Sequence, residues 1–336
     1  MTDLNRRTFL ALPIASVLIP TAAALFPEES EAQPPRQIDF TQNLPAKGSF
    51  PDKWIHGSPS CLDNRDPAIQ VHWYNEHTAI LRQNKAYSYE APFMHLYFGN
   101  ERILLIDQGY TKLAHDWPLR EVVELCIKEW CLRNHRRPED MALLLSFTHL
   151  HDDHYAAIDQ FADRPNTRAM GLTHEQMIGF WGMTNYPDQR VSLDLGGRNI
   201  LIWGSPGHVL SEFAYYDTYT QILFTGDMFY AGRCYISFWD KWFASMQRLI
   251  AFVDTHPVTH IVGCHIEISR TGEDYPYGIT YQPDEAPLQL SVDDLRHAYA
   301  ISQKVTEPGI YFTGKVFLCN QTRGTTTVDQ NPYAYN

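Results

Sequence analysis

The segment Thr148–His154, with the sequence THLHDDH, places three histidines and two aspartates within seven residues. It directly follows the apolar run Met141–Phe147, whose length and polar flanks predict a buried strand. The cluster is therefore expected where a strand ends and a loop begins, a usual position for functional side chains. Imidazole and carboxylate groups are ligands that Zn²⁺ prefers. A lone histidine is most often a plain core or surface residue, so it is the density of ligands that predicts a metal site here.

Three later segments repeat one arrangement, in which an apolar run and a turn of small residues precede one side chain able to bind a metal. His208 follows Ser205-Pro206-Gly207, Asp227 ends the run LFTGD from Leu223, and His265 ends the run IVGCH from Ile261. Each segment alone is weak evidence, because such tripeptides also occur in plain turns. Their recurrence in this order, after THLHDDH, is the strong signal.

The ordered motifs HxHxDH, PGH and FTGD, followed by a histidine at a strand end, resemble the metallo-β-lactamase superfamily. Ile103–Gly109 (ILLIDQG) resembles the early LIDxG strand and turn of that family, so the similarity spans about residues 93–268. The resemblance implies an α/β (α+β) fold, a four-layer αβ/βα sandwich with the metal site at the edge of the two β-sheets. It also implies a ligand set: His149, His151 and His208 for a first metal, Asp153, His154 and His265 for a second, and Asp227 as the bridge between them.

The aspartate at the bridging position makes the predicted site resemble the glyoxalase II and lactonase branches of the superfamily. Two segments depart from the family pattern, with Tyr155-Ala156-Ala157 in place of the frequent Gly-Gly and Val209–Glu212 in place of the common Thr-x-Gly-Ser. These departures keep the ligands but change the expected pocket wall. His260, which opens the same predicted strand as His265, is a rival for the last ligand position.

Two metal ions held close together predict hydrolytic chemistry. A zinc-bound water has a pKa of about 7, so a hydroxide bridging two ions is available to attack a carbonyl or phosphoryl centre. We expect two Zn²⁺ per chain, with iron and manganese as the alternatives, and count Asp153 among the catalytic residues. Asp107 and Asp152 are candidate acceptors for the outer ring nitrogens of ligand histidines, although Asp152 fits a solvated loop equally well. Tyr230 is a candidate hydrogen-bond donor to a developing oxyanion, with a packed aromatic ring as the equal alternative.

The predicted function is hydrolysis of an ester, thioester, lactone or β-lactam of a small molecule by a dinuclear zinc site. One alternative is an iron-dependent persulfide dioxygenase, which would use His149, His208 and Asp227 on one ion. Less favoured alternatives are a phosphodiesterase and a metal-binding protein without turnover. No residue is assigned to substrate binding, but residues 173–187 are the expected specificity lid, and residues 267–287 are a second candidate wall.

The first residues predict export. Asn5–Leu10 (NRRTFL) resembles a twin-arginine signal, and the apolar segment Phe9–Ile19 is too short to span a bilayer comfortably. We therefore expect residues 1–32 to be a signal peptide that engages the export machinery, and the mature protein to be periplasmic or secreted without a membrane anchor. The first cysteine, Cys61, lies far from any cleavage site, which argues against a lipid anchor.

Composition indicates an acidic globular enzyme. The formal net charge is −12, and removing residues 1–32 leaves 25 basic and 35 acidic side chains, a net charge of −10. Such a surface does not attract phosphate backbones, so no nucleic-acid partner is expected. Six cysteines are too few for a disulfide scaffold. The expected organisation is an extended lead-in over residues 33–70 and one catalytic domain over residues 71–336.

Hydrophobic patterning predicts the individual elements of this domain. Strands are expected at 71–81, 94–98, 103–106, 141–147, 199–203, 212–217, 221–225 and 261–263, and helices at 119–133 and 240–255. A last helix, to about residue 304, is expected to begin at Ser291, because Ser291 and Asp294 form a capping-box pattern.

Overall fold

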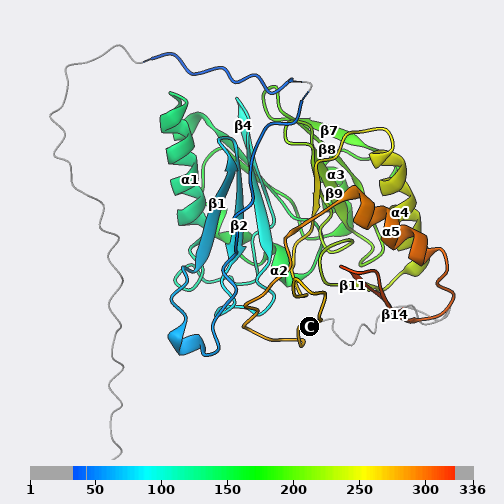
Figure 1. The fold of residues 1–336 in the computed structure, drawn as a ribbon. Coiled ribbons are helices and arrows are strands. Elements are labelled where there is room, and N and C mark those ends of the chain that lie inside the picture. Colours follow the sequence, from blue (N-terminus) through cyan, green and yellow to red (C-terminus); the bar gives the residue numbers. More distant parts are fainter. Residues whose placement is uncertain (1–32, 43, 322–336) are drawn as a thin grey trace, which may run out of the picture. The chain divides into compact units, whose positions relative to one another are not determined.

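The computed structural model describes residues 33–42 and 44–321, so the predicted signal peptide lies outside the described residues. From Pro35 onward the described chain forms one compact unit. Two β-sheets face each other at its centre, with helices on both outer sides (Figure 1). This arrangement confirms the four-layer αβ/βα sandwich. Among the described helices, none has both the length and the apolar character needed to cross a bilayer.

The first sheet comes from the N-terminal half, and its strand order β1-β2-β3-β4-β5-β6 follows the sequence. Its strands are β1 (Ile69–Asn75), β2 (Thr78–Gln83), β3 (Phe93–Phe98), β4 (Arg102–Ile106), β5 (Ala142–Ser146) and β6 (Thr167–Ala169). The pairs β1–β2, β2–β3 and β3–β4 are antiparallel, whereas the pairs β4–β5 and β5–β6 are parallel. Parallel pairing brings the carboxyl ends of β4 and β5 to one edge, and the motif THLHDDH leaves the sheet there.

The second sheet comes from the C-terminal half and has the order β13-β12-β10-β9-β8-β7. Its strands are β7 (Val191–Asp194), β8 (Asn199–Gly204), β9 (Phe213–Asp217), β10 (Ile222–Phe224), β12 (His260–Val262) and β13 (Gln289–Leu290). Strands β10 and β12 are parallel, so the residues that follow both of them emerge at one edge. A smaller sheet, with the order β11-β15-β14, contains β11 (Arg233–Ile236), β14 (Gly309–Phe312) and β15 (Phe317–Asn320).

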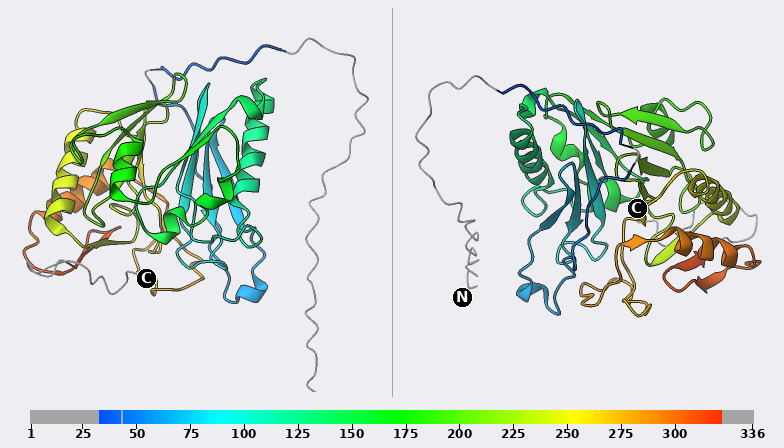
Figure 2. Two further views of the ribbon diagram at one scale, coloured as in Figure 1. Left: turned by 180° about the vertical axis from the view of Figure 1, so that it is seen from behind. Right: turned by 45° about the horizontal axis from the view of Figure 1, so that its top comes forward.

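Helices cover the outer faces of the two large sheets. Helix α1 (Leu119–Arg133) lies outside the first sheet, and α4 (Trp239–Val253) and α5 (Val292–Ser302) lie outside the second, as the view from behind also shows (Figure 2). The short helix α2 (Asp152–Tyr155) lies at the edge where the two sheets approach each other, and α3 (His174–Phe180) precedes β7. Three short 3-10 segments complete the described helices: Cys61–Asp63, Pro138–Asp140 and Ile158–Phe161.

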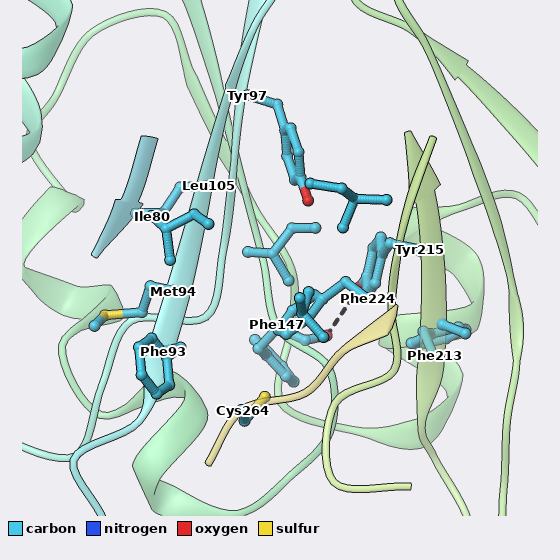
Figure 3. Close-up of a cluster of buried hydrophobic side chains, with 14 of the residues drawn as sticks. Ile80, Phe93, Met94, Tyr97, Leu105, Phe147, Phe213, Tyr215, Phe224 and Cys264 are labelled. Atoms are coloured by element: carbon cyan, nitrogen blue, oxygen red, sulfur yellow. Dashed lines mark hydrogen bonds between the residues drawn. The ribbon is translucent and has the colours of Figure 1, made fainter. Parts of the chain in front are cut away.

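The space between the sheets is filled by aromatic and aliphatic side chains of both halves (Figure 3). Phe93 and Tyr97 of β3 face Tyr215 of β9 and Phe224 of β10, and all four are almost fully buried. The hydroxyl of Tyr215 donates to the carbonyl of Phe147, 3.1 Å away, so the core also joins the two sheets directly above the metal-ligand loop. A rigid, close-packed core of this kind fixes the ends of the strands that carry functional residues.

The predicted strand over residues 71–81 is wrong, because the chain turns at Glu76 and His77 and forms the antiparallel pair β1–β2. The other predicted elements are present within a few residues of their expected bounds, and α1 has the expected bounds. Ser291 and Asp294 form the predicted capping box at the start of α5. The lead-in residues Phe40 and Trp54 are buried against the body, and Trp54 contacts Phe93 edge to face.

Candidate metal centre

Three histidine rings from two loops converge on one point. His149 and His151 follow β5, and His208 follows β8. The Nδ1 atom of His151 lies 3.0 Å from Nε2 of His149 and 3.0 Å from Nε2 of His208. These three side chains form the first of the two histidine-rich clusters, and their nitrogens lie close enough to bind one ion.

The hydrogen bond made by the outer nitrogen of His208 determines which of its ring nitrogens carries the proton. Nδ1 of His208 lies 2.6 Å from the carbonyl oxygen of Tyr235, which only accepts, so this nitrogen carries the proton and Nε2 offers a lone pair. Nδ1 of His149 lies 3.1 Å from Oγ1 of Thr148. Burial lowers the pKa of His149 and His208, and lowers the pKa of His151 to about 4. Neutral rings with converging lone pairs repel one another unless a cation lies between them.

A second cluster combines two carboxylates with two histidines. Oδ2 of Asp153 lies 3.0 Å from Nε2 of His154 and 3.2 Å from Nε2 of His265, and Oδ1 of Asp227 lies 3.3 Å from the same nitrogen of His265. All four side chains are buried. Asp153 and His154 belong to α2, whereas Asp227 follows β10 and His265 follows β12, so both halves of the molecule contribute.

Asp227 belongs to the second cluster and also faces the first. Its Oδ2 is 3.9 Å from Nε2 of His149, 3.8 Å from Nε2 of His208 and 3.7 Å from Nε2 of His154. Its Oδ1 faces His265. One carboxylate with an oxygen toward each cluster is the geometry that a ligand shared by two metal ions requires.

The donor atoms fit a pair of divalent cations. Nε2 of His154 and Oδ1 of Asp227 are buried without a hydrogen-bond partner, which is costly unless an ion satisfies them. Burial lowers the pKa of His154, but the carboxylates of Asp153 and Asp107 outweigh it and hold that pKa well above its usual value. This excess of negative charge is what a divalent cation would neutralise. Imidazole nitrogen and carboxylate oxygen are zinc donors, so the chemistry of the set fits as well.

Asp107 supports both the metal-ligand loop and a ligand histidine. It follows β4, and its carboxylate accepts from the backbone N–H of Thr148 at 2.6 Å, and from Nδ1 of His154 at 3.0 Å. The thiol of Cys264 donates to the same carboxylate at 3.1 Å. Asp107 has a φ of 65°, in the left-handed region that costs a non-glycine residue about 1 kcal/mol. It therefore lies where the sequence analysis expects an acceptor for the outer nitrogen of a ligand histidine.

The contacts of Tyr230 match the second of its two predicted roles, that of a packed aromatic ring. Its hydroxyl donates to the carbonyl of Arg233 and lies 3.1 Å from Oε2 of Glu267, while its ring packs edge to face on His265. Because a phenol has one proton and Arg233 receives it, Tyr230 in this arrangement is a packing residue and not an oxyanion donor.

Two other candidates lie outside the clusters. His260 begins β12 and packs against Phe50, so His265 and not its rival joins the ligand set. Asp152 is exposed, and its Oδ1 accepts from the hydroxyl of Tyr155 at 2.7 Å. The carboxylate of Asp152 therefore belongs to the loop surface and not to the outer nitrogens of the ligand histidines.

Two glutamates at the site were not assigned a role from the sequence. Glu212 is fully buried, and one of its carboxyl oxygens accepts from the backbone N–H of Asp227 at 3.2 Å. Burial and the negative charge of Asp227 raise the pKa of Glu212 well above its usual value. The backbone carbonyl of Glu90 accepts from Nδ1 of His265 at 3.0 Å and orients that ring. The sequence offered one signal for Glu212, a carboxylate where the family pattern has Thr-x-Gly-Ser.

A pocket of about 400 Å³ opens onto the ligands. Its lining includes ligands of both clusters and residues from separate parts of the chain: Tyr89, Glu90, Tyr110, Leu150, His151, Asp152, Asp153, Tyr155, His208, Asp227, Tyr230, Tyr235, His265, Glu267, Tyr277 and Gln321. No residue of the predicted lid, 173–187, belongs to this lining. Tyr186 of that segment instead donates to the carbonyl of Leu210. Residues 267–287, which the sequence offers as a second candidate wall, contribute Glu267 and Tyr277 to the lining of the pocket.

A family model matches the part of the chain that contains the ligands of both clusters. Residues 132–298, about half of the chain, match the family model described as the metallo-beta-lactamase superfamily. Similar solved structures include TMB-1 (15% identity, TM-score 0.47, 71% of this chain and 99% of that chain) and the DIM-1 metallo-beta-lactamase (14%, 0.46, 71% and 99%). A third is the metallo-beta-lactamase from Pontibacter korlensis (18%, 0.44, 70% and 100%). No curated protein gives a significant sequence match.

Proposed function

Because the chain belongs to the metallo-β-lactamase superfamily, we propose that it is a dinuclear zinc hydrolase acting on an ester, thioester, lactone or β-lactam of a small molecule. The observation that carries the proposal is the position of Asp227, whose two oxygens face the two clusters of candidate ligands. Zinc ions held there would make hydroxide available near neutral pH and polarise a carbonyl group.

The chain's own residues hold and orient the site. His149, His151 and His208 present three lone pairs to one position, while Asp153, His154 and His265 present theirs to the other. Asp107 and the carbonyl of Glu90 fix the outer nitrogens of His154 and His265, so these rings cannot turn away. The pocket of about 400 Å³ suits a small molecule.

Metal content is the first test. We expect purified protein, without added metal, to contain about two zinc ions per chain by inductively coupled plasma mass spectrometry, as follows from the two ligand sets. His149→Ala and His265→Ala should each lower the zinc content, because each removes a ligand of a different cluster. His260→Ala is the matched control, since this histidine packs against Phe50 outside both clusters, and it should retain the wild-type content.

About one iron and no zinc per chain would contradict the zinc hydrolase and favour the iron-dependent persulfide dioxygenase, with His149, His208 and Asp227 on one ion. A wild-type zinc content with no turnover of any ester, thioester, lactone or β-lactam would contradict hydrolysis itself. The first result would show that the proposed metal is wrong, and the second that the proposed reaction is wrong.

We also propose that the enzyme is exported through a twin-arginine signal within residues 1–32 and acts in the periplasm or outside the cell. The support is the order of the sequence, in which Arg6 and Arg7 precede the apolar segment Phe9–Ile19. Replacing both arginines by lysine should retain the protein in the cytoplasm, as measured by fractionation. Unchanged export of that variant would rule out this route.

A further inference from the structure

The pocket wall carries negative charge and no cation of its own. Apart from the metal ligands, its lining contains the carboxylates Glu90, Asp152 and Glu267 and six tyrosines, and within the part of the chain that the structure describes it contains neither lysine nor arginine. We propose that the pocket selects substrates that carry an organic ammonium group over substrates of the same shape that carry a carboxylate. This inference rests on the proposed function, because it assumes that the carbonyl is cleaved at the metal centre.

Glu267 keeps the wall negative even though it has a cationic neighbour. Arg233 donates to Oε1 of Glu267 at 2.9 Å and also pairs with Asp274. One guanidinium is thus shared by two carboxylates, which leaves a net negative charge beside the pocket. The same guanidinium donates to the carbonyl of Tyr275, so its donors point into the wall and not toward a substrate.

The other two carboxylates have no cationic neighbour in the lining. Asp152 is exposed at the rim, where its carboxylate accepts a hydrogen bond from the hydroxyl of Tyr155, a neutral donor. Glu90 lies beside Tyr89 and His265, and burial and the charge of Asp153 raise its pKa to about 7, so it contributes only part of a negative charge at neutral pH. The nearby cation Lys85 is buried outside the lining, with Nζ 3.0 Å from the carbonyl of Tyr89 and 4.0 Å from Glu285. It therefore offers no contact to an anionic substrate.

The tyrosines add a second and independent preference for a cation. The rings of Tyr89 and Tyr277 pack at 5.3 Å between centroids, and their hydroxyls are 2.6 Å apart, so the two form one aromatic wall. Tyr155 also lines the pocket, and its hydroxyl donates to Asp152 at 2.7 Å. The faces of aromatic rings attract quaternary ammonium groups through the negative charge of the ring face.

Bound metal ions do not reverse this preference. Their positive charge would attract a substrate carboxylate, but that carboxylate would take the metal positions that the scissile carbonyl needs. Non-productive binding of that kind lowers kcat and KM together and leaves kcat/KM unchanged, so kcat/KM reports only the productive orientation. Away from the ions, a carboxylate on the substrate meets only Glu90, Asp152, Glu267 and ring faces.

Three phenyl esters of equal length test the inference, with acyl chains that end in trimethylammonium, tert-butyl or carboxylate. After correction for uncatalysed hydrolysis, we expect kcat/KM of the metal-loaded enzyme to fall in that order, with a difference on the order of tenfold between the extremes. The ratio should shrink as salt is raised, because screening weakens the charge interaction.

Two matched variants locate the effect. Asp152→Asn keeps the shape and removes one charge from the wall, so it should reduce the ratio of ammonium to carboxylate ester several-fold. Asp159→Asn removes the same charge from an exposed position outside the lining and should leave the ratio at the wild-type value. Equal effects of the two variants would attribute the preference to overall charge and overturn the assignment to the pocket.

Binding is measured separately by calorimetry, using non-hydrolysable phenyl ethers with the same three end groups. Tighter binding of the ammonium ether supports the inference even if no ester is hydrolysed, a result that would contradict the proposed function alone. Hydrolysis of all three esters with an equal or higher kcat/KM for the carboxylate ester would overturn the inference and keep the hydrolase. Arg323→Ala is measured as well, because Arg323 lies two positions after Gln321, outside the described residues. A preference for carboxylate that this variant abolishes would also overturn the inference.

Discussion

Asp107 shows how one carboxylate determines which nitrogen of a histidine faces a metal. Its Oδ2 accepts from Nδ1 of His154, so Nε2 of that ring is left with a lone pair toward Asp153 and Asp227. Its other oxygen accepts from the backbone of Thr148. A ligand histidine held in the wrong tautomer presents a proton to the ion and cannot bind it.

Asp107→Asn therefore has a specific expected outcome. The amide oxygen keeps the bond to Thr148, while the amide N–H groups face Nδ1 of His154 and move the ring proton to Nε2. We expect the affinity for the second metal to fall about 10–100-fold, measured by competition with a chelator. Cys264→Ser is the matched control, because serine still donates to Asp107. Unchanged affinity of Asp107→Asn would mean that Asp107 only supports the loop.

Single residues also show which parts of the site could be predicted from sequence. His149, His208, Asp227 and His265 each follow an apolar run, so their common location at strand ends is readable from pattern alone. The bond of the Tyr230 hydroxyl is not, because it depends on where Arg233 and the distant Glu267 lie after folding. Local pattern places a side chain, whereas its hydrogen bonds depend on tertiary contacts.

The turn between β1 and β2 shows the same limit for an element. The apolar run across residues 71–81 predicts one strand, but Glu76 and His77 interrupt it with a turn. His77 makes this turn stable from the inside, because its Nδ1 accepts from the indole N–H of Trp130 at 3.0 Å. That bond connects the turn to α1, 53 positions away in the chain. The sequence pattern around the turn does not predict such a distant contact.

The burial of His77 predicts a pH dependence of stability. Burial and the charges of Arg198, Arg36 and Arg133 lower its pKa from 6.5 to about 4. The folded state then binds fewer protons than the unfolded state between these values, so stability is full above pH 6.5 and falls as the pH falls toward 4. The loss is at most about 3 kcal/mol.

Denaturant unfolding at several pH values checks this expectation, with a chelator present throughout so that metal release does not contribute. His77→Gln keeps an acceptor for Trp130 and should flatten the fall in unfolding free energy between pH 6.5 and 4. The exposed His115 provides the control, and His115→Gln should retain the wild-type slope. A wild-type slope in His77→Gln would assign the acid sensitivity to other groups.

In the molecule as a whole, a buried arginine joins the two sheets at the end away from the ligands. Arg198, between β7 and β8, donates to the carbonyls of His77 and Phe98 in the first sheet. It also forms a fully buried bidentate pair with Asp217 of the second sheet, at 2.9 and 2.6 Å. The ligand loops and α2 lie at the opposite edge (Figure 1). There, the metal-binding groups of both halves meet, beside direct contacts such as the backbone N–H of Phe93 donating to the carbonyl of Cys264 at 2.8 Å.

Removing the metal should therefore destabilise the whole molecule and not only the site. The first half contributes His149, His151, Asp153 and His154, and the second half contributes His208, Asp227 and His265, so ions bound by both sets stabilise only the folded arrangement of the sheets. At a free metal concentration 1,000 times Kd this stabilisation is about 4 kcal/mol. For a chain of this size, a chelator should then lower the unfolding temperature by roughly 10 °C in a calorimetric scan.

Variants of the ligands show whether the shift in unfolding temperature arises because bound metal ions connect the two halves. His260→Ala leaves both clusters intact, so it should lose the same stability on chelation as the wild type. His149→Ala and His265→Ala remove one ligand each from different clusters, and each should begin at a lower unfolding temperature and respond less to the chelator. If the wild type unfolded at the same temperature with and without metal, the ions would not hold the halves together. The contacts through Arg198 and the core would then account for the joining of the sheets by themselves.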